Sequence, residues 1–206
     1  MSSSTPVITY FQLDFEGRAG AIYLLLSDAG VAYRRVDVPR SDWPTLQKQL
    51  IANDASPNGT LPIMELDGRT YVHQLPILRV LVRHLGKYGG NDEDEAYEID
   101  SFADLVADYH SAWSRAHWSD DDSIKTYYRD ESRPRLLAGI DRFLARRKGG
   151  PYLLGDTPSY ADFMLLAVLL DDKPPALEGY PHLKAFSEAM RQRPGIVRYL
   201  TTRPAE

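Results

Sequence analysis

The signals for strand and helix change once along this chain, close to residue 90, and that change limits its possible folds. Before residue 90, short runs of β-branched and aromatic residues alternate with helical stretches. After residue 94 only helical periodicity remains. Alternating strands and helices are typical of an α/β domain, and consecutive helices are typical of a bundle. We therefore expect an α/β domain followed by an all-α domain.

The first half reads in the order β-α-β-α-β-β-α. Gly30 and Gly86 follow two helices, at the position where a left-handed residue often ends them. Asp67-Gly68 separates two short strands and is a strong signal for a hairpin turn. The expected strands cover 7–13, 32–38, 62–66 and 69–72, and the expected helices cover 18–29, a short stretch capped by Ser41, and 74–85.

The second half predicts helices only. Glycine-rich residues 86–94 read as a connecting segment. Ser159-Tyr160-Ala161-Asp162 fits a capping box in which an aspartate replaces the usual glutamate. The expected helices run from 95 to about 118, around Ile140 and Leu144, after Ser159, and from Pro181 to Arg193-Pro194. These signals predict a first domain over 1–86, a linker over 87–94 and an all-helical domain over 95–206.

Composition excludes several kinds of chemistry. The net charge of −5 gives no basic footprint, so nucleic acid is not an expected partner. The chain contains no cysteine, which excludes disulfides, thiolate metal sites and a cysteine nucleophile. The start has no basic-then-apolar signal pattern, and the longest apolar run is too short to span a bilayer. We expect a cytoplasmic protein without a membrane partner.

Tyr10 is the first candidate functional residue. It stands near the end of the first strand, and a short loop leads from there to a helix that opens at Arg18. The start of a helix favours an anion, because its N–H groups are unpaired and its dipole is positive there. A phenol at that place could hold a thiolate. The alternative for Tyr10 is a half-buried strand aromatic, which is the common fate of a tyrosine in such a run.

Three motifs resemble the cytosolic glutathione S-transferases, specifically the tyrosine-type sigma, pi and mu branch. They are Tyr10-Phe11 followed by Gly17-Arg18-Ala19, Leu61-Pro62 leading into the Asp67-Gly68 hairpin, and Ser159 to Asp162. The resemblance covers nearly the whole chain. It implies a thioredoxin-like glutathione-binding domain with a cis peptide before Pro62, and a helical domain that forms the pocket for the electrophile. It also implies a homodimer, glutathione as co-substrate, no metal, and a role in detoxification.

The resemblance also implies particular site residues. Tyr10 and Arg18 match the residues near the thiol, and Asp108 matches an aspartate that reaches across a dimer. The implied glutathione ligands are Tyr10, Trp43, Gln47, Lys48, Thr60, Leu61, His73, Gln74 and Asp108. The implied electrophile pocket contains Phe15, His110, Ser114 and His117.

The peptide site departs from the family pattern at three places. Thr60-Leu61-Pro62 replaces Gln-Leu-Pro, so the resemblance implies only backbone contact there. Gln47, with Lys48 beside it, stands where the family has a lysine, and His73-Gln74 replaces a Gln-Ser pair. Residues 51–60 also read as a longer, polar loop. We therefore expect weak glutathione binding.

Several residues keep an alternative interpretation. Asp108 has the alternative of a solvated helix charge. The spacing of His110 and His117 favours, by about two to one, two partly exposed, hydrogen-bonded histidines over catalytic ones. The pair lacks a third ligand at suitable spacing, so it predicts no metal site.

The predicted function is a glutathione transferase that activates the thiolate for attack on small electrophiles. One alternative is a glutathione-dependent isomerase of the prostaglandin D synthase kind. A second alternative, from another class, is a non-catalytic ligand-binding relative that keeps the fold. The sequence names no electrophile, because the shape of the second pocket decides it.

Overall fold

A computed structural model describes residues 4–146, 149–174 and 177–202 of the chain. The described residues form two compact units. The first unit contains the residues up to Leu85 together with those from Pro194 onward, and the second contains Gly86–Arg193. We expected all residues from 95 onward to lie in one helical domain, whereas the last helix groups with the first unit.

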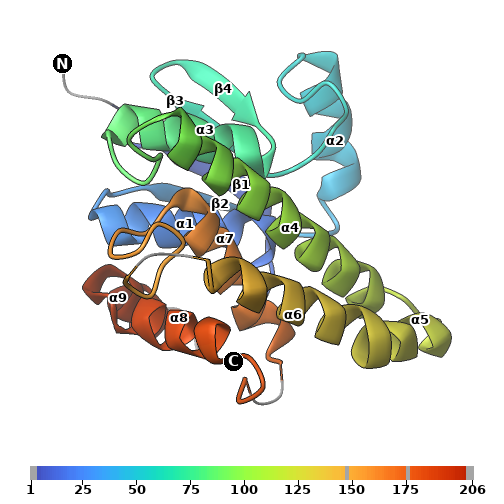
Figure 1. Cartoon of the computed structure of the whole chain (residues 1–206). Coiled ribbons are helices and arrows are strands. Elements are labelled where there is room, and N and C mark those ends of the chain that lie inside the picture. The colour runs from blue at the N-terminus through green and yellow to red at the C-terminus, as the bar shows by residue number, and fades with distance from the viewer. Residues whose placement is uncertain (1–3, 147–148, 175–176, 203–206) are drawn as a thin grey trace. The chain divides into compact units, whose positions relative to one another are not determined.

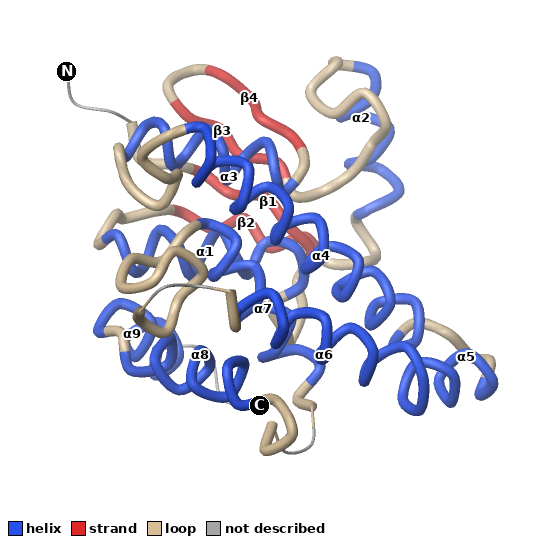
Figure 2. The backbone as a smooth tube through the Cα atoms, in the orientation of Figure 1, coloured by secondary structure: helices blue, strands red, loops and turns tan. Residues whose placement is uncertain are grey.

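The first unit is built on a four-stranded sheet with the strand order β2-β1-β3-β4. Strand β1 pairs in parallel with β2, and β3 pairs antiparallel with both β1 and β4. The strands are coloured red in Figure 2. Their bounds are β1 Val7–Phe11, β2 Arg34–Val38, β3 Ile63–Leu66 and β4 Arg69–Val72.

Helices complete the first unit. Helix α1 buries a nearly continuous apolar stretch, from Ala19 to Leu26, and it contacts both α3 and α9. Gly30 ends α1 in the left-handed conformation, as the sequence predicts. The helices of this unit are α1 Gly17–Ala29, α2 Trp43–Ala52, α3 Gln74–Leu85 and α9 Pro194–Thr202.

The second unit is helical throughout its described elements. The 25-residue helix α4 packs against α7, which is buried from Tyr160 to Leu169 because nearly all of its residues are apolar. Figure 1 shows α4 in green crossing this unit, with α5 beyond its end and α6 running back beside it. The elements are α4 Glu93–His117, α5 Asp122–Tyr127, the π-helical segment η1 Tyr128–Ser132, α6 Arg133–Leu144, α7 Tyr160–Asp172 and α8 Pro181–Gln192.

The predicted capping box is present at the start of α7. Ser159 N–H and Ser159 Oγ–H donate to Asp162 Oδ2 at 2.6 and 2.7 Å. Leu153 N–H donates to the other oxygen, Oδ1, at 3.0 Å. Asp162 is fully buried, so its carboxylate holds the preceding loop as well as the helix start.

The structure confirms the fold class and shifts several element bounds. Strand β4 and helix α3 have the predicted ends, whereas β1 ends at Phe11 rather than residue 13, and β2 begins at Arg34 rather than residue 32. Asp42 rather than Ser41 occupies the cap position of α2. Helix α4 begins at Glu93, inside the predicted linker, because Asp92 caps it by accepting a hydrogen bond from Glu95 N–H at 2.8 Å.

Candidate functional site

The phenol of Tyr10 lies against the first turn of α1. Tyr10 is the next-to-last residue of β1, and only 8% of its surface is exposed. Its Oη accepts a hydrogen bond from the backbone N–H of Arg18 at 3.0 Å. That N–H is one of the donors that a helix start leaves without an intrahelical acceptor. The structure therefore brings Tyr10 and the backbone of Arg18 together.

Gly17 allows this close approach. Its φ of +55° lies in the left-handed region, and a Cβ placed there would be 2.8 Å from both Cε1 and Oη of Tyr10. Any side chain at residue 17 would therefore displace either the phenol or the helix start. The sequence shows a glycine here but not its contact with Tyr10.

The loop that precedes α1 is anchored from the other end of the chain. Tyr199, on α9, donates its hydroxyl to Glu16 Oε2 at 2.6 Å. Glu16 is 3% exposed, and burial raises the pKa of Tyr199, with the Glu16 carboxylate adding to the rise. Phe15, a predicted pocket residue, lies next to this anchor and is partly buried. Sequence reasoning missed this pair, because its members are 183 residues apart in the sequence and neither lies in a motif.

Trp43 is held next to the end of β1. Its ring meets Phe11 edge to face at 4.9 Å between centroids, and Phe11 meets Tyr10 in the same way at 5.5 Å. This chain of aromatic contacts connects the predicted thiol residue with a predicted glycyl-end ligand. Trp43 remains partly exposed.

Gln47 is used within the protein. Its Nε2 donates to the carbonyl of Gly59 at 2.9 Å, which fixes the loop after α2, while Lys48 is exposed. The predicted long loop is shorter than expected because α2 continues to Ala52.

Ser56 organises the remainder of that loop. It is fully buried, and its Oγ accepts from Thr60 N–H at 2.9 Å and donates to the Thr60 carbonyl at 3.0 Å. The hydroxyl of Thr60 donates to Asn58 at 3.0 Å. Ser56 therefore sets the backbone that leads into Leu61.

The peptide bond between Leu61 and Pro62 is cis, as the resemblance implies. Leu61 is 8% exposed and lies two residues before the start of β3. Across the described residues, its N–H and C=O make no backbone hydrogen bond. An extended peptide could therefore pair with both groups in the manner of an added strand.

His73 and Gln74 stand at the start of α3. The exposed His73 has a φ of 65°, a conformation that few non-glycine residues adopt and that often marks a ligand site. Its carbonyl accepts from Ile77 N–H at 3.1 Å, so it occupies the cap position. Gln74 is 8% exposed and is the first residue of the helix. A carboxylate at this start would meet N–H donors and a positive dipole.

The second unit presents its candidate residues along α4. The buried His110 and the exposed His117 both contact Trp113, at 5.5 and 4.9 Å between centroids. Ser114 is partly buried, and Asp108 is exposed. Trp113 was not singled out from the sequence, although its place between two histidines on a helix face could have suggested the contact.

The described residues contain no cluster of three or more histidine, aspartate or glutamate side chains that could hold a metal ion. Within the same residues, no helix is both long enough and apolar enough to cross a membrane.

Residues 107–203 match the family model of the glutathione S-transferase C-terminal domain. The chain is 32% identical over 202 residues to glutathione S-transferase P of Caenorhabditis elegans, an alignment that covers 96% of this chain and 93% of that protein. It is 27% identical over 206 residues to hematopoietic prostaglandin D synthase of Homo sapiens, covering 96% of both.

Solved structures of glutathione S-transferases also resemble this chain. The pi-class glutathione S-transferase of Onchocerca volvulus superposes with a TM-score of 0.85 and 29% identity. The superposition covers 97% of this chain and 94% of that one.

Proposed function

This chain belongs to the glutathione S-transferase family, and from that premise we propose that Tyr10 activates the thiol of glutathione for attack on a small electrophile. The observation that carries the proposal is the hydrogen bond from Arg18 N–H to Tyr10 Oη. A tyrosine oxygen that accepts one hydrogen bond still has its own hydrogen to donate. The N–H also draws electron density from the phenol oxygen, which makes the hydroxyl a better donor.

The energy needed is within the range of such a contact. A free thiol has a pKa near ~8.5, so little thiolate exists at neutral pH. Lowering that pKa by about two units requires roughly 2.7 kcal/mol of preferential stabilisation of the thiolate. A charge-assisted hydrogen bond from Tyr10 supplies about 1.5–3 kcal/mol, and the positive end of α1 adds to it.

The reaction then follows from the thiolate. The sulfur lone pair forms a bond to an electrophilic carbon, and a leaving group departs with its bonding electrons. The thiol proton has passed to solvent before this step. Tyr10 remains protonated and stabilises the sulfur anion until the new bond removes its charge.

The peptide part of glutathione would bind along the first unit. The geometry supports backbone pairing at Leu61 and carboxylate binding at the start of α3, beside His73 and Gln74. Trp43 would meet the glycyl end. The proposed set is completed by Gln47, Lys48, Thr60 and Asp108, and Gln47 acts chiefly through the loop that its amide fixes.

A glutathione-dependent isomerase is the second candidate function. The observation that favours it is the 27% identity to hematopoietic prostaglandin D synthase of Homo sapiens over almost the entire chain. The proposed electrophile pocket contains Phe15, His110, Ser114 and His117. Product analysis separates the two functions, because a transferase consumes glutathione and an isomerase returns it.

Assembly and location complete the proposal. We infer a cytoplasmic homodimer with a role in detoxification, in which Asp108 of one protomer binds the glutathione held by its partner. A twofold contact would give each dimer two equivalent sites.

The test replaces Tyr10 with Phe and measures both binding and turnover. We expect glutathione affinity by calorimetry to remain within about twofold, since the phenol meets only the thiol. Turnover of 1-chloro-2,4-dinitrobenzene should fall at least about tenfold, equal to ~1.4 kcal/mol of transition-state stabilisation. The ultraviolet absorbance of bound thiolate should disappear at neutral pH.

Tyr71→Phe is the control, because Tyr71 lies on β4 and is neither a proposed glutathione ligand nor a residue of the proposed electrophile pocket. It should leave turnover and thiolate absorbance unchanged. Equal turnover in wild type and Tyr10→Phe would remove Tyr10 from the mechanism. No binding at millimolar glutathione would favour the ligand-binding alternative.

A further inference from the structure

A buried phenol and a buried carboxylate meet behind the start of α1, and the proposed mechanism makes no use of them. Tyr199 is 8% exposed and Glu16 is 3% exposed, and the Tyr199 hydroxyl donates to Glu16 Oε2 at 2.6 Å. A carboxylate loses its hydration on burial, so hydrogen bonds must compensate for that loss. Burial and the Glu16 carboxylate raise the pKa of Tyr199, so its hydroxyl keeps the hydrogen that it donates.

The Glu16 side chain packs against the first turn of α1. Glu16 occupies the cap position of this helix, and its carbonyl accepts a hydrogen bond from Gly20 N–H at 3.1 Å. An added Cβ on Gly20 would lie 2.3 Å from Glu16 Cβ and 2.9 Å from Glu16 Oε2. Because the carbonyl and the side chain of Glu16 both meet this turn, holding the carboxylate also holds the backbone where the helix begins.

The two residues that follow Glu16 hold the phenol of Tyr10. An added Cβ on Gly17 would lie 2.8 Å from Tyr10 Oη, and Arg18 N–H donates to that oxygen at 3.0 Å. A shift of the backbone at Glu16 would therefore move both neighbours of the phenol. Misplacement of a reacting group by about 1 Å can lower a rate by about a hundredfold, so such a shift matters for catalysis.

Helix α9 is a firm support for the Tyr199 hydroxyl. Near the start of α9, Gly195 lies so close to the last turn of α1 that an added Cβ would be 2.4 Å from Asp28 Cα and 2.5 Å from the Ser27 carbonyl oxygen. Further along α9, Tyr199 reaches Glu16 at the other end of α1. Helix α9 therefore meets α1 at both of its ends, and the hydroxyl is placed relative to the helix that it steadies.

We propose, on the premise that Tyr10 activates the thiol, that Tyr199 and Glu16 are positioning residues for this activation. By holding the Glu16 carboxylate, Tyr199 keeps Gly17 and Arg18 N–H in the places that direct the phenol toward the sulfur. Both residues act on the sulfur only through Tyr10. The last helix of the chain thus takes part in setting the pKa of the bound thiol.

The expected direction of the effect follows from the hydrogen bond to sulfur. A hydrogen bond to the charged form of a group lowers its pKa, so the Tyr10 hydroxyl lowers the pKa of the bound thiol. Tyr199→Phe removes a donor from the Glu16 carboxylate and lets the helix start relax. The hydrogen bond from Tyr10 then weakens, and the pKa of the bound thiol rises.

The test measures the pKa of bound glutathione from the ultraviolet absorbance of its thiolate between acid and alkaline pH. We expect Tyr199→Phe to raise this pKa by about 0.5–1 unit, which lowers the thiolate fraction about three- to tenfold at pH values below the wild-type pKa. Turnover of 1-chloro-2,4-dinitrobenzene should fall by the same factor there, and the KM for glutathione should stay within about twofold. The difference in turnover should disappear above the thiol pKa of the variant, whereas a partly unfolded variant would lose the same fraction at every pH.

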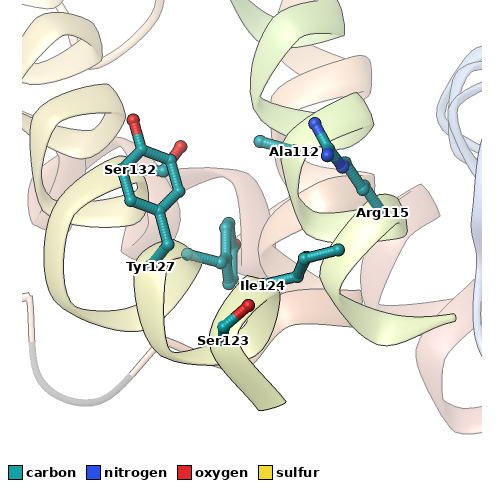
Figure 3. Close-up of a pocket in the computed structure, with 7 residues that line it drawn as sticks. Ala112, Arg115, Ser123, Ile124, Tyr127 and Ser132 are labelled. Atoms are coloured by element: carbon teal, nitrogen blue, oxygen red, sulfur yellow. The ribbon is translucent and has the colours of Figure 1, made fainter. Parts of the chain in front are cut away.

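Two tyrosines supply matched controls. Tyr33 is partly buried and its hydroxyl bonds with Ser27 Oγ at 3.3 Å, so Tyr33→Phe loosens the last turn of α1 and not its first. Tyr127 is 62% exposed and lines a pocket of the second unit together with Ile124 (Figure 3). Tyr33→Phe and Tyr127→Phe should both leave the thiol pKa unchanged. A rise in Tyr33→Phe equal to that in Tyr199→Phe would overturn the specific role of the first turn.

Variants of Glu16 test whether it acts by accepting the hydrogen bond. Glu16→Gln keeps an acceptor oxygen for Tyr199 and removes a negative charge, so the thiol pKa should stay at or below its wild-type value. Glu16→Ala should raise that pKa as Tyr199→Phe does, and the two changes combined should raise it no further, because they break one contact. Additive rises, or equal rises in the Gln and Ala variants, would contradict the proposal. Tyr199→Phe and Glu16→Gln decide the matter if Glu16→Ala does not fold.

Tyr10→Phe, measured in parallel, separates this role from the proposed function. A raised thiol pKa in Tyr10→Phe together with a wild-type pKa in Tyr199→Phe would overturn the positioning role alone. A wild-type complex without thiolate absorbance at any pH below that of free glutathione would overturn thiol activation, and the positioning role with it.

Discussion

Gly17 sets the position of the Tyr10 phenol. Its backbone has a φ of +55°, and an added Cβ would lie 2.8 Å from Tyr10 Oη. Gly17→Ala should therefore lower the turnover of 1-chloro-2,4-dinitrobenzene at least about tenfold, since small displacements of a catalytic group have large effects on rate. It should also lower the free energy of unfolding by about 1–2 kcal/mol, because alanine is unfavourable at positive φ.

Gly30→Ala provides the control for backbone strain. Gly30 also has a positive φ, 71°, but nothing lies within 4 Å of an added Cβ. It should show a similar loss of stability in urea unfolding and normal turnover. If both variants lose turnover equally, the effect of Gly17→Ala is strain and not displacement of Tyr10.

Single residues differ in how well the sequence predicts their roles. The placement of Tyr10 beside a helix start follows from a strand, a short loop and a helix in sequence order, and the structure shows that contact. The roles of Ser56 and Glu16 could not be predicted. Each depends on a buried hydrogen bond to a loop or to a residue far away in the chain, and local patterns do not encode such partners.

At the scale of elements, the start of α7 depends on one carboxylate. Asp162→Ala removes the acceptor for two donors of Ser159 and for Leu153 N–H, all of them buried. Each buried donor left without an acceptor costs about 1–3 kcal/mol, so we expect a loss of at least ~3 kcal/mol in the free energy of unfolding. Urea titration measures this loss, when both proteins are fitted with the same dependence of the unfolding free energy on urea concentration.

Asp121→Ala is the matching variant at an exposed helix cap, for comparison with the buried cap residue Asp162. Asp121 caps α5 through one hydrogen bond, from Ser123 N–H, and no residue of α5 is buried. The expected loss is about 0.5–1 kcal/mol, as for an ordinary cap. Similar losses for the two variants would show that the burial of Asp162 adds nothing to the cap.

The elements that the sequence predicts best are those with clear ends. Strand β4 and helix α3 lie between a turn glycine and a helix-ending glycine, and both match their predicted bounds. The segment α5–η1 was not predicted as two elements, because a π-helical turn has no sequence signature of its own. Helix α9 was missed because Arg193-Pro194 was interpreted as an end, although proline is also favoured in the first turn of a helix.

At the scale of the whole molecule, buried tyrosines should limit stability in alkali. Burial raises the pKa of Tyr23 and Tyr199 in the first unit and of Tyr109 and Tyr128 in the second. A nearby carboxylate adds to each rise and a nearby arginine opposes it, but burial has the largest effect on all four pKa values. A phenol is neutral when protonated, so the folded chain keeps protons that the unfolded chain releases above about pH 10. This contribution is therefore complete below pH 10 and is lost as the pH rises further, by about 1.4 kcal/mol per pH unit for each tyrosine.

Tyr23→Phe tests that account. Among the described residues, the hydroxyl of Tyr23 has no hydrogen-bond partner, while its ring stacks on Tyr33 and lies 4.4 Å from the guanidinium carbon of Arg35. Phenylalanine should keep the packing. Above pH 10, the unfolding free energy of the variant should fall less steeply with pH, by the amount that one released proton contributes. An unchanged slope between pH 10 and 11 would contradict the raised pKa of Tyr23.

The proposed dimer makes a prediction of its own. Asp108 is exposed on α4, so Asp108→Ala should fold normally. If Asp108 binds the ammonium group of glutathione in the partner protomer, the variant should bind glutathione about three- to tenfold more weakly, as for the loss of one partly screened charge contact. Light scattering that shows an active monomer would contradict a role across an interface.

The return of α9 to the first unit has a consequence for how the protein is made. Tyr199 reaches Glu16 across a sequence separation of 183 residues, and Gly195 lies against Asp28. A ribosome releases the chain from its N-terminus, so the sheet and α1 emerge long before α9, which packs against α1. The first unit must therefore wait until residues 194–202 have been synthesised before α9 can pack against α1. During that wait the apolar side of α1 that α9 later covers would be available to chaperones, and a nascent chain stopped before residue 194 would remain their client.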